Sequence, residues 1–252
     1  MAPGGEVGGV LCGYHPVEEA LVRGTRHLGT LYLARNRHSA RTRRLEQLAR
    51  DRGMKIKQVD TRSLDRLAAT KNHQGVVATV EAKAALDLED FLGSLAEGEP
   101  SVVVVLDGVQ DPHNLGAVIR NCALTRTRAV ILPRDRTAGI TAVVEKVAAG
   151  GLEHVDVVRI GNLAAALRRL KEAGFWTVGA DEKGEIELPE ADLDGRLALI
   201  IGDEHRGLRR LTKEHCDQLV RIPTTGTIGS YNMGMAAGLF LFFAFLRHRS
   251  PE

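Results

Sequence analysis

Six short, almost uninterrupted apolar runs in the later part of the chain constrain its fold most strongly. They are Val102–Leu106, Ala129–Leu132, Val155–Ile160, Trp176–Val178, Leu197–Ile201 and Leu219–Ile222. Segments of helical character separate these runs. A strand that is apolar on both faces must be covered on both faces, and alternation with helices is typical of parallel sheets. The sequence therefore predicts an α/β fold with a parallel sheet over residues 101–252.

Glycine-rich turns with polar side chains follow several of these runs. Three groups stand out: Asn114/Gly116/Arg120, Gly202/Glu204/Gly207 and Ile222/Pro223/Gly226/Ser230/Asn232. In α/β sheets, loops that follow the strands build the ligand site. The second group is not the dinucleotide-binding G-x-G-x-x-G pattern, because a glutamate replaces the middle glycine. The third lacks the G-x-S-x-G elbow of serine hydrolases.

The preceding part of the chain indicates a smaller α/β unit. We expect an N-terminal tail over residues 1–12, a domain over 13–84, and an acidic linker over 85–100 that ends in Gly-Glu-Pro. Within the domain, helices are predicted over Pro16–Val22 and Ser39–Arg52, and strands over Leu28–Ala34 and Gly75–Val80.

Charge is distributed unevenly along the chain. Residues 1–84 hold 15 Lys and Arg against 8 Asp and Glu, whereas the whole chain holds 34 and 32. A basic front part beside an acidic remainder suggests that the front part meets a polyanion. Arginines of ordinary solvated helices are the alternative interpretation of a surplus of this size.

The last predicted helix, Met233–Leu246, is apolar on almost every side. It carries four of the six phenylalanines: Phe240, Phe242, Phe243 and Phe245. A membrane span needs about 20 apolar residues, which this run does not reach. A helix that is apolar all round must be buried all round. A partner subunit is therefore expected to cover part of it, with an internal core helix as the alternative.

The placement of the cysteines and histidines bears on whether the chain forms disulfides or binds a metal. Cys12, Cys122 and Cys216 are odd in number and far apart, which favours a reduced, cytoplasmic protein without disulfides. The nine histidines and three cysteines show no metal-ligand spacing, so we expect no catalytic metal. Residues 1–12 have no signal-peptide pattern.

The three motif groups match, in order and spacing, the signatures of a known family. They follow N-x-G-x-x-x-R, G-x-E-x-x-G and I-P-x-x-G-x-x-x-S-x-N, and Gly13–Leu21 and His73–Ala78 match as well. In these features the chain resembles the SpoU (TrmH) family of RNA ribose 2′-O-methyltransferases, in particular its RlmB-like group. The resemblance covers nearly the whole sequence.

That resemblance implies a reaction and an assembly. The reaction is methyl transfer from S-adenosylmethionine to a ribose 2′-hydroxyl, and the substrate implied is a guanosine in 23S rRNA. The implied architecture is a SPOUT-type parallel sheet with a deep trefoil knot, preceded by a ribosomal-protein-like RNA-binding domain. The implied assembly is a homodimer, with RNA as partner and no membrane.

The resemblance also implies roles for individual residues. Arg120 would act on the nucleophilic hydroxyl. A guanidinium is difficult to deprotonate, so we expect it to hydrogen-bond the hydroxyl or the adjacent phosphate and stabilise negative charge. The other implied active-site residues are Asn114, Glu204, Ser230 and Asn232, and the implied donor-binding residues are Gly202, Ile222 and Tyr231.

Simpler roles compete with several of these. Asn114 occupies a helix N-cap position if a helix opens at Leu115, Ser230 is a possible N-cap of the last helix, and Glu204 is a possible compensating charge at a helix N-terminus.

Other functions stay open, and departures from the family pattern bear on one of them, an RNA-binding homologue that has lost donor binding. Tyr231 stands where leucine is common, and Gly234 stands where serine is common. A transfer-RNA methyltransferase, an enzyme protecting the ribosome from an antibiotic, and an RNA-binding homologue without donor binding are the alternatives.

Overall fold

The chain forms two compact units. The computed structural model describes residues 7–35, 39–135, 137–204, 206–226 and 231–248. One unit contains Met1–Lys83 together with Ile140–Glu153, and the other contains Ala84–Gly139 together with His154–Glu252. The first unit is thus discontinuous in sequence, and its second segment lies within the range predicted for the parallel-sheet domain.

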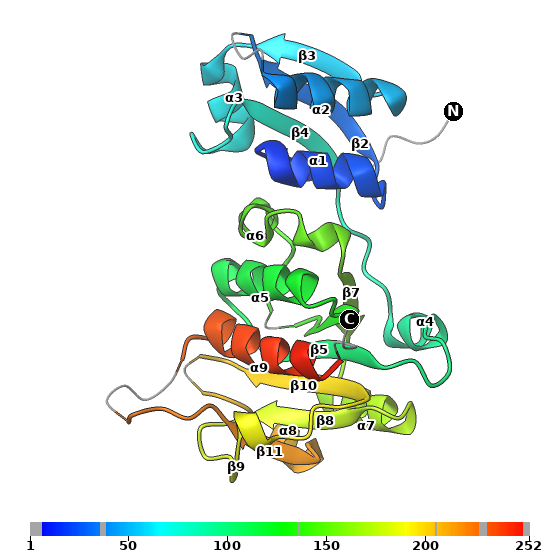
Figure 1. The fold of residues 1–252 in the computed structure, drawn as a ribbon, viewed down its shortest axis with the longest axis vertical. Coiled ribbons are helices and arrows are strands. Elements are labelled where there is room, and N and C mark those ends of the chain that lie inside the picture. Colours follow the sequence, from blue (N-terminus) through cyan, green and yellow to red (C-terminus); the bar gives the residue numbers. More distant parts are fainter. Residues whose placement is uncertain (1–6, 36–38, 136, 205, 227–230, 249–252) are drawn as a thin grey trace. The chain divides into compact units, whose positions relative to one another are not determined.

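The first unit is built on a four-stranded sheet of order β1-β4-β2-β3 (Figure 1). β4 is antiparallel to both β1 and β2, and β2 is parallel to β3. Its strands are β1 (Val7–Cys12), β2 (Leu28–Ala34), β3 (Lys55–Val59) and β4 (Val76–Glu81). Its helices are α1 (Tyr14–Arg23), α2 (Ala40–Asp51), α3 (Thr61–Ala68), α6 (Ala142–Ala148) and the short 3-10 helix η1 (Gly151–Glu153).

Helices cover both faces of this sheet. α1 and α2 bury Val17, Leu21 and Leu45 against one face, and α3 buries Leu64 against Val77 on the other. The predicted helices and strands of residues 13–84 are present. The predicted tail is wrong in part, because Val7–Cys12 forms β1 and pairs with β4. β3 and α3 were not predicted.

A buried ion cluster holds the second segment of this unit. The guanidinium of Arg26 is hydrogen-bonded to Glu145 on α6, with Nη1 2.5 Å from Oε1, and to Glu153 in η1, with Nε 2.9 Å from Oε1. The Thr25 hydroxyl also donates to Glu153. All three charged side chains are at most 6% exposed. Burial alone would lower the pKa of Arg26, but the bonds to both carboxylates reverse the direction and raise it.

The second unit contains a seven-stranded sheet of order β7-β6-β5-β10-β8-β11-β9, in which every pairing is parallel. Each of the six predicted runs is a strand, so the prediction of a parallel α/β sheet is confirmed. The strands are β5 (Ser101–Asp107), β6 (Ala129–Pro133), β7 (Asp156–Ile160), β8 (Trp176–Ala180), β9 (Ile186–Glu187), β10 (Arg196–Gly202) and β11 (Gln218–Arg221).

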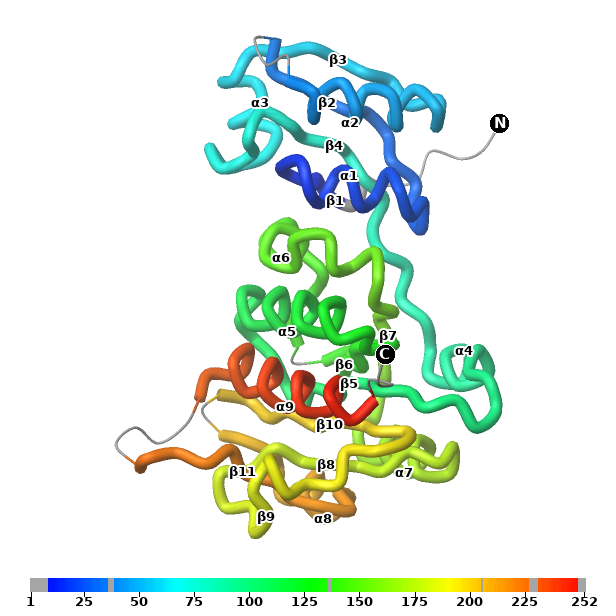
Figure 2. The backbone as a smooth tube through the Cα atoms, viewed as in Figure 1, coloured from blue at the N-terminus to red at the C-terminus, as the bar shows by residue number. Residues whose placement is uncertain are grey.

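Helices cover this sheet on both sides (Figures 1 and 2). α4 (Leu88–Gly93), α7 (Leu163–Glu172) and α8 (Arg210–His215) lie on one side, and α5 (Pro112–Leu124) and α9 (Met233–His248) lie on the other. A short 3-10 helix, η2 (Leu188–Glu190), follows β9. Phe91 of α4 is completely buried in the core with Val105 and Ile131. The linker predicted over 85–100 is therefore corrected, since this segment packs on the sheet.

The start of α5 differs from one expectation, and the exposure of α9 contradicts the alternative of an internal core helix. α5 begins at Pro112, and Asp111 is its N-cap, accepting a hydrogen bond from the His113 amide at 2.8 Å. Asn114 therefore lies inside the first turn and is not the cap. Burial all round α9 is not found within one chain, because Met235 and Phe242 are 54% and 52% exposed. In the described part of the chain, no helix has the length and hydropathy that a membrane crossing requires.

Candidate methyl-donor site

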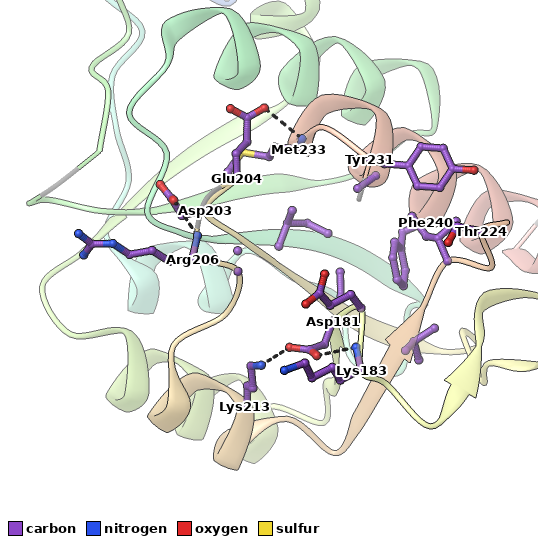
Figure 3. Close-up of a pocket in the computed structure, with 18 residues that line it drawn as sticks. Asp181, Lys183, Asp203, Glu204, Arg206, Lys213, Thr224, Tyr231, Met233 and Phe240 are labelled. Atoms are coloured by element: carbon purple, nitrogen blue, oxygen red, sulfur yellow. Dashed lines mark hydrogen bonds and ion pairs between the residues drawn. The ribbon is translucent and has the colours of Figure 1, made fainter. Parts of the chain in front are cut away.

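A cavity of about 370 Å³ lies at the carboxyl ends of β8, β10 and β11 (Figure 3). Its walls come from the residues after β8 (Ala180–Lys183), the loop after β10 (Gly202–Gly207 without the undescribed 205), and the face of α9 that carries Met233, Ala236 and Phe240. Four predicted site residues line it: Gly202, Glu204, Ile222 and Tyr231. Crevices outside the carboxyl ends of strands are where open α/β sheets bind ligands.

The loop after β10 is closed so tightly that its first residue must be glycine. The Gly207 amide donates to the Asp203 carbonyl at 2.8 Å, and the Arg206 amide donates to Asp203 Oδ1 at 3.3 Å. A Cβ on Gly202 would lie 2.2 Å from the carbonyl carbon of Gly207, where no atom fits. Gly207 has φ 62°, which glycine adopts without strain. The loop therefore presents backbone to the cavity.

Glu204 links this loop to the start of α9. Its Oε1 accepts a hydrogen bond from the Met233 amide at 3.4 Å, as the dashed line in Figure 3 shows. A carboxylate beside free amides at a helix N-terminus is favourable. This contact is the simpler role considered for Glu204, and it also ties two walls of the cavity together.

Asn232 caps α9. Its Oδ1 accepts a hydrogen bond from the Met235 amide at 2.8 Å, and its carbonyl accepts from Ala236. Tyr231 precedes it and is 43% exposed while lining the cavity. Ser230, the other candidate at this position, lies outside the described residues.

Arg120 and Asn114 stand on α5, which packs against α9. Neither lines the cavity. The Arg120 side chain is exposed, and within the described ranges no carboxylate pairs with it. Asn114 Oδ1 lies 3.9 Å from the position that a Cβ on Gly234 would occupy, which places it beside the start of α9. The structure thus brings Asn114 near Asn232, and leaves the Arg120 guanidinium open to solvent.

Glycines on α9 allow the close approach of α5. A Cβ on Gly234 would lie 3.0 Å from the Ala117 Cβ, and one on Gly238 would lie 2.9 Å from Asn121 Nδ2. Asn121 Nδ2 donates to the Gly234 carbonyl at 3.0 Å. Gly234, which departs from the family pattern, is therefore matched to its neighbour on α5.

Asp107, at the carboxyl end of β5, was missed by the sequence analysis. Its side chain is fully buried, and its Oδ2 accepts from the Arg209 amide at 2.9 Å and from the Thr212 hydroxyl at 2.7 Å. Arg209 Nε lies 3.3 Å from Oδ1, an ion pair that lacks hydrogen-bond geometry. Asp107 thus anchors the segment that follows the Gly202–Gly207 loop. An aspartate directly after a fully apolar run was the available signal.

Another ion pair, between Asp181 and Lys213, lies in the wall of the cavity. Asp181, whose side chain is 5% exposed, pairs with Lys213 and accepts from the Lys183 amide at 2.9 Å (Figure 3). Apolar groups such as Phe240 form the opposite wall. Within the described ranges, no three His, Cys, Asp or Glu side chains are grouped to hold a metal ion.

A parallel sheet, a cavity at its carboxyl edge and a basic α/β unit define an α/β protein with a small-molecule site and an appended domain. The family is shown by comparison with known proteins. The model of the SpoU rRNA Methylase family matches residues 101–242, and that of the RNA 2′-O ribose methyltransferase substrate binding domain matches residues 10–85. This chain belongs to the SpoU rRNA methylase family.

Curated relatives match along the full length. The 23S rRNA (guanosine-2′-O-)-methyltransferase RlmB of Shewanella oneidensis is 40% identical, covering 96% of this chain and 98% of the relative. The protein of that name from Ralstonia nicotianae is 41% identical, covering 96% of each.

Solved structures show the same fold. An AdoMet-bound rRNA methyltransferase from Sinorhizobium meliloti has a TM-score of 0.79 at 24% identity, covering 96% of this chain and 88% of that one. The SpoU methyltransferase AviRb from Streptomyces viridochromogenes, in complex with AdoMet, has a TM-score of 0.78 at 24% identity, covering 95% and 89%.

Proposed function

We propose that this chain transfers a methyl group from S-adenosylmethionine to the ribose 2′-hydroxyl of a guanosine in 23S rRNA. Family membership and the activity named for relatives about 40% identical over nearly the whole chain support this proposal. One observation of the structure carries it: Gly202 and Glu204 from the loop after β10, and Ile222 and Tyr231 from the connection between β11 and α9, line one cavity.

The cavity suits the methyl donor. Its volume of about 370 Å³ falls within the usual range for small-molecule sites. Glycine at 202 lets the loop after β10 close into one wall of the cavity, Ile222 and Phe240 offer apolar surface, and the Asp181–Lys213 pair offers charge. When bound, S-adenosylmethionine supplies a methyl group attached to a positively charged sulfur, so the chain's own residues must position the donor and the accepting hydroxyl.

The accepting side of the reaction is assigned to α5. We infer that Arg120 hydrogen-bonds the ribose hydroxyl or its neighbouring phosphate and stabilises the negative charge that develops on oxygen. Asn114 and Asn232, which lie at the α5–α9 contact, would hold the start of α9 in place. The hydrogen bond from Asn121 to Gly234 supports this assignment, because it ties the helix that carries Arg120 to a cavity wall.

We assign RNA binding to the first unit. Its region 10–85 matches the substrate-binding model, and α2 presents exposed arginines, including Arg41 and Arg43. Side chains of this kind neutralise phosphates without reading sequence.

We further propose that the chain acts as a homodimer in the cytoplasm. Met235, Phe242 and Leu246 of α9 are all about half exposed, and their spacing places them on one face of the helix. A second copy related by a two-fold axis would bury that face. The trefoil knot is part of the same proposal. The return of the chain from β11 to α9, which packs on α5 and β10, supports it.

The proposed activity has a direct test. Purified protein is incubated with radiolabelled S-adenosylmethionine and, separately, 23S rRNA and tRNA, and the modified ribose is then mapped. We expect label at a single guanosine of 23S rRNA. Label in tRNA alone would contradict the proposed substrate, and absence of donor binding by calorimetry would contradict the proposed reaction.

A further inference from the structure

A second cavity, of about 560 Å³, opens in the parallel-sheet unit away from the methyl-donor site. Residues after β6, in β7 and around the start of α4 line it, including Arg134, Thr137, Arg159, Asp87 and Asp90. Neither the motif analysis nor the proposed chemistry uses these residues. We call this cavity the arginine pocket.

The strand register places the arginine pocket on the same edge of the sheet as the methyl-donor site. Gly202 of β10 is paired with Asp107 of β5, and Pro133 of β6 is paired with Ile160 of β7. Val105 of β5 is paired with Ile131 of β6, and Asp107 and Pro133 each lie two residues further along their strands. The carboxyl ends of these four strands therefore form one row, in which Gly202 and Ile160 are about 14 Å apart at the usual strand spacing.

Both arginines are held by backbone contacts and lack an internal counter-ion. Arg159 Nη1 donates to the Pro133 carbonyl at 3.2 Å, and the Arg134 amide donates to the Ile160 carbonyl at 2.8 Å. Among the described residues, no carboxylate forms an ion pair with either guanidinium. Burial lowers the pKa of Arg159, which means that the surroundings remove water from its charge without replacing it by an anion.

The two aspartates that line the arginine pocket stand at the start of α4. Asp87 Oδ1 accepts a hydrogen bond from the Asp90 amide at 3.0 Å and so caps α4. Both side chains are exposed and stand at the helix N-terminus, where a negative charge is favourable. They leave the guanidinium donors of the pocket available to a ligand.

We propose that the arginine pocket binds a backbone phosphate of the RNA strand, close to the nucleotide whose ribose is methylated. The inference rests on the proposed function and extends it. Two planar guanidinium groups with free donors are suited to a phosphodiester. A strand whose target ribose faces the methyl-donor site and continues along the carboxyl edge would place a flanking phosphate there. Contacts of this kind fix the register of a nucleic acid and carry no sequence information.

The test measures RNA binding and turnover separately. Arg134→Gln, Arg159→Gln and the double variant are compared with wild type for affinity toward 23S rRNA at several salt concentrations. Each lost phosphate contact lowers the slope of log affinity against log salt by roughly 0.7 for single strands. We expect the double variant to lose about tenfold or more in affinity and about 0.7 in slope, as for one lost phosphate. KM for RNA should rise in parallel, with kcat at saturating RNA and donor affinity within about twofold of wild type.

Matched variants separate charge from structure. Arg168→Gln removes an exposed arginine on α7 and should leave affinity and slope unchanged. Arg159→Lys keeps the charge and should bind RNA more tightly than Arg159→Gln does. Asp90→Asn removes a negative charge from the pocket and should bind RNA more tightly than wild type does. Wild-type affinity and slope in the double variant would overturn the proposal, as would a lysine variant as weak as the glutamine one. RNA binding is measured without donor, so these outcomes stand even if the proposed methylation fails.

Discussion

The two sheets of this protein organise function in different ways. In the seven-stranded sheet every strand runs in the same direction, so the loops after β8, β10 and β11 meet at one edge and enclose a cavity. In the four-stranded sheet β4 runs against β1 and β2, so no single edge collects the loops. There, the surface that we propose for RNA binding is a charged helix face. Strand direction thus decides whether a sheet builds a site at its end or only supports helices that bind through their outer faces.

The largest effect is expected from breaking the ion cluster of the first unit. Arg26→Met leaves Glu145 and Glu153 buried without a counter-ion, which should cost about 3–5 kcal/mol of unfolding free energy. Calorimetric or denaturant unfolding measures this. Arg23→Met, which removes an exposed pair with Glu19, should cost at most about 1 kcal/mol.

A triple variant tests whether the uncompensated charge or the lost packing causes this loss of stability. Replacing Arg26, Glu145 and Glu153 together by apolar residues of similar size should recover much of the stability, because no charge remains buried. A triple variant as unstable as Arg26→Met would show that packing, and not the uncompensated charge, causes the loss.

Arg120→Ala tests the parallel-sheet unit at its proposed chemical centre. Loss of a group that stabilises developing charge should lower the single-turnover methylation rate about 100- to 1000-fold, while donor affinity stays within a few-fold. Rapid-quench kinetics with saturating RNA measures the rate. A near-normal rate would remove Arg120 from the mechanism.

Gly202→Ala tests the wall of the methyl-donor site. The added methyl group would lie 2.2 Å from Gly207, so the loop must move away from its present position. We expect donor affinity, measured by calorimetry, to fall about 100-fold. Gly161→Ala is the control, since an added Cβ there meets no atom within 4 Å and donor affinity should not change. Tight donor binding by Gly202→Ala would contradict the assigned wall.

The smallest effect concerns the helix face of the first unit. Arg41→Gln with Arg43→Gln should weaken RNA binding a few-fold and lower the salt slope by roughly 1.4, with donor affinity unchanged. Fluorescence anisotropy at several salt concentrations measures this. If both parameters match wild type, the first unit does not grip RNA through α2.

The thiols give a chemical comparison of the two sheets. Burial raises the pKa of Cys216, beside β8, to about 12, with Lys171 opposing it only in part. Burial also raises the pKa of Cys12 on β1 and of the fully buried Cys122 on α5. All three should be alkylated slowly at pH 8, because little thiolate is present. Peptide mass spectrometry should find Cys122 slowest, and rapid alkylation of Cys216 would show that the β8–α8 contact opens.

The parallel sheet was predictable because strands that are buried on both faces appear in the sequence as unbroken apolar runs. Val102–Leu106 is such a run. β9 was not predicted because Ile186–Glu187 is too short to show a pattern. β3 was not predicted because Lys55–Val59 is a largely exposed edge strand. The motifs located four lining residues of the cavity. They could not locate Asp107 or the arginine pocket, because those roles depend on contacts between segments far apart in sequence.

The discontinuity of the first unit has a consequence for synthesis on the ribosome. Arg26 emerges early, but its partners Glu145 and Glu153 follow more than a hundred residues later. At translation rates of about 5–20 residues per second, the four-stranded sheet waits several seconds or more for them. Through that interval the two carboxylates that pair with Arg26 in the folded unit are missing, so the buried ion cluster can form only after Glu153 has been made. Completion of the N-terminal domain is thereby timed to the appearance of the catalytic one.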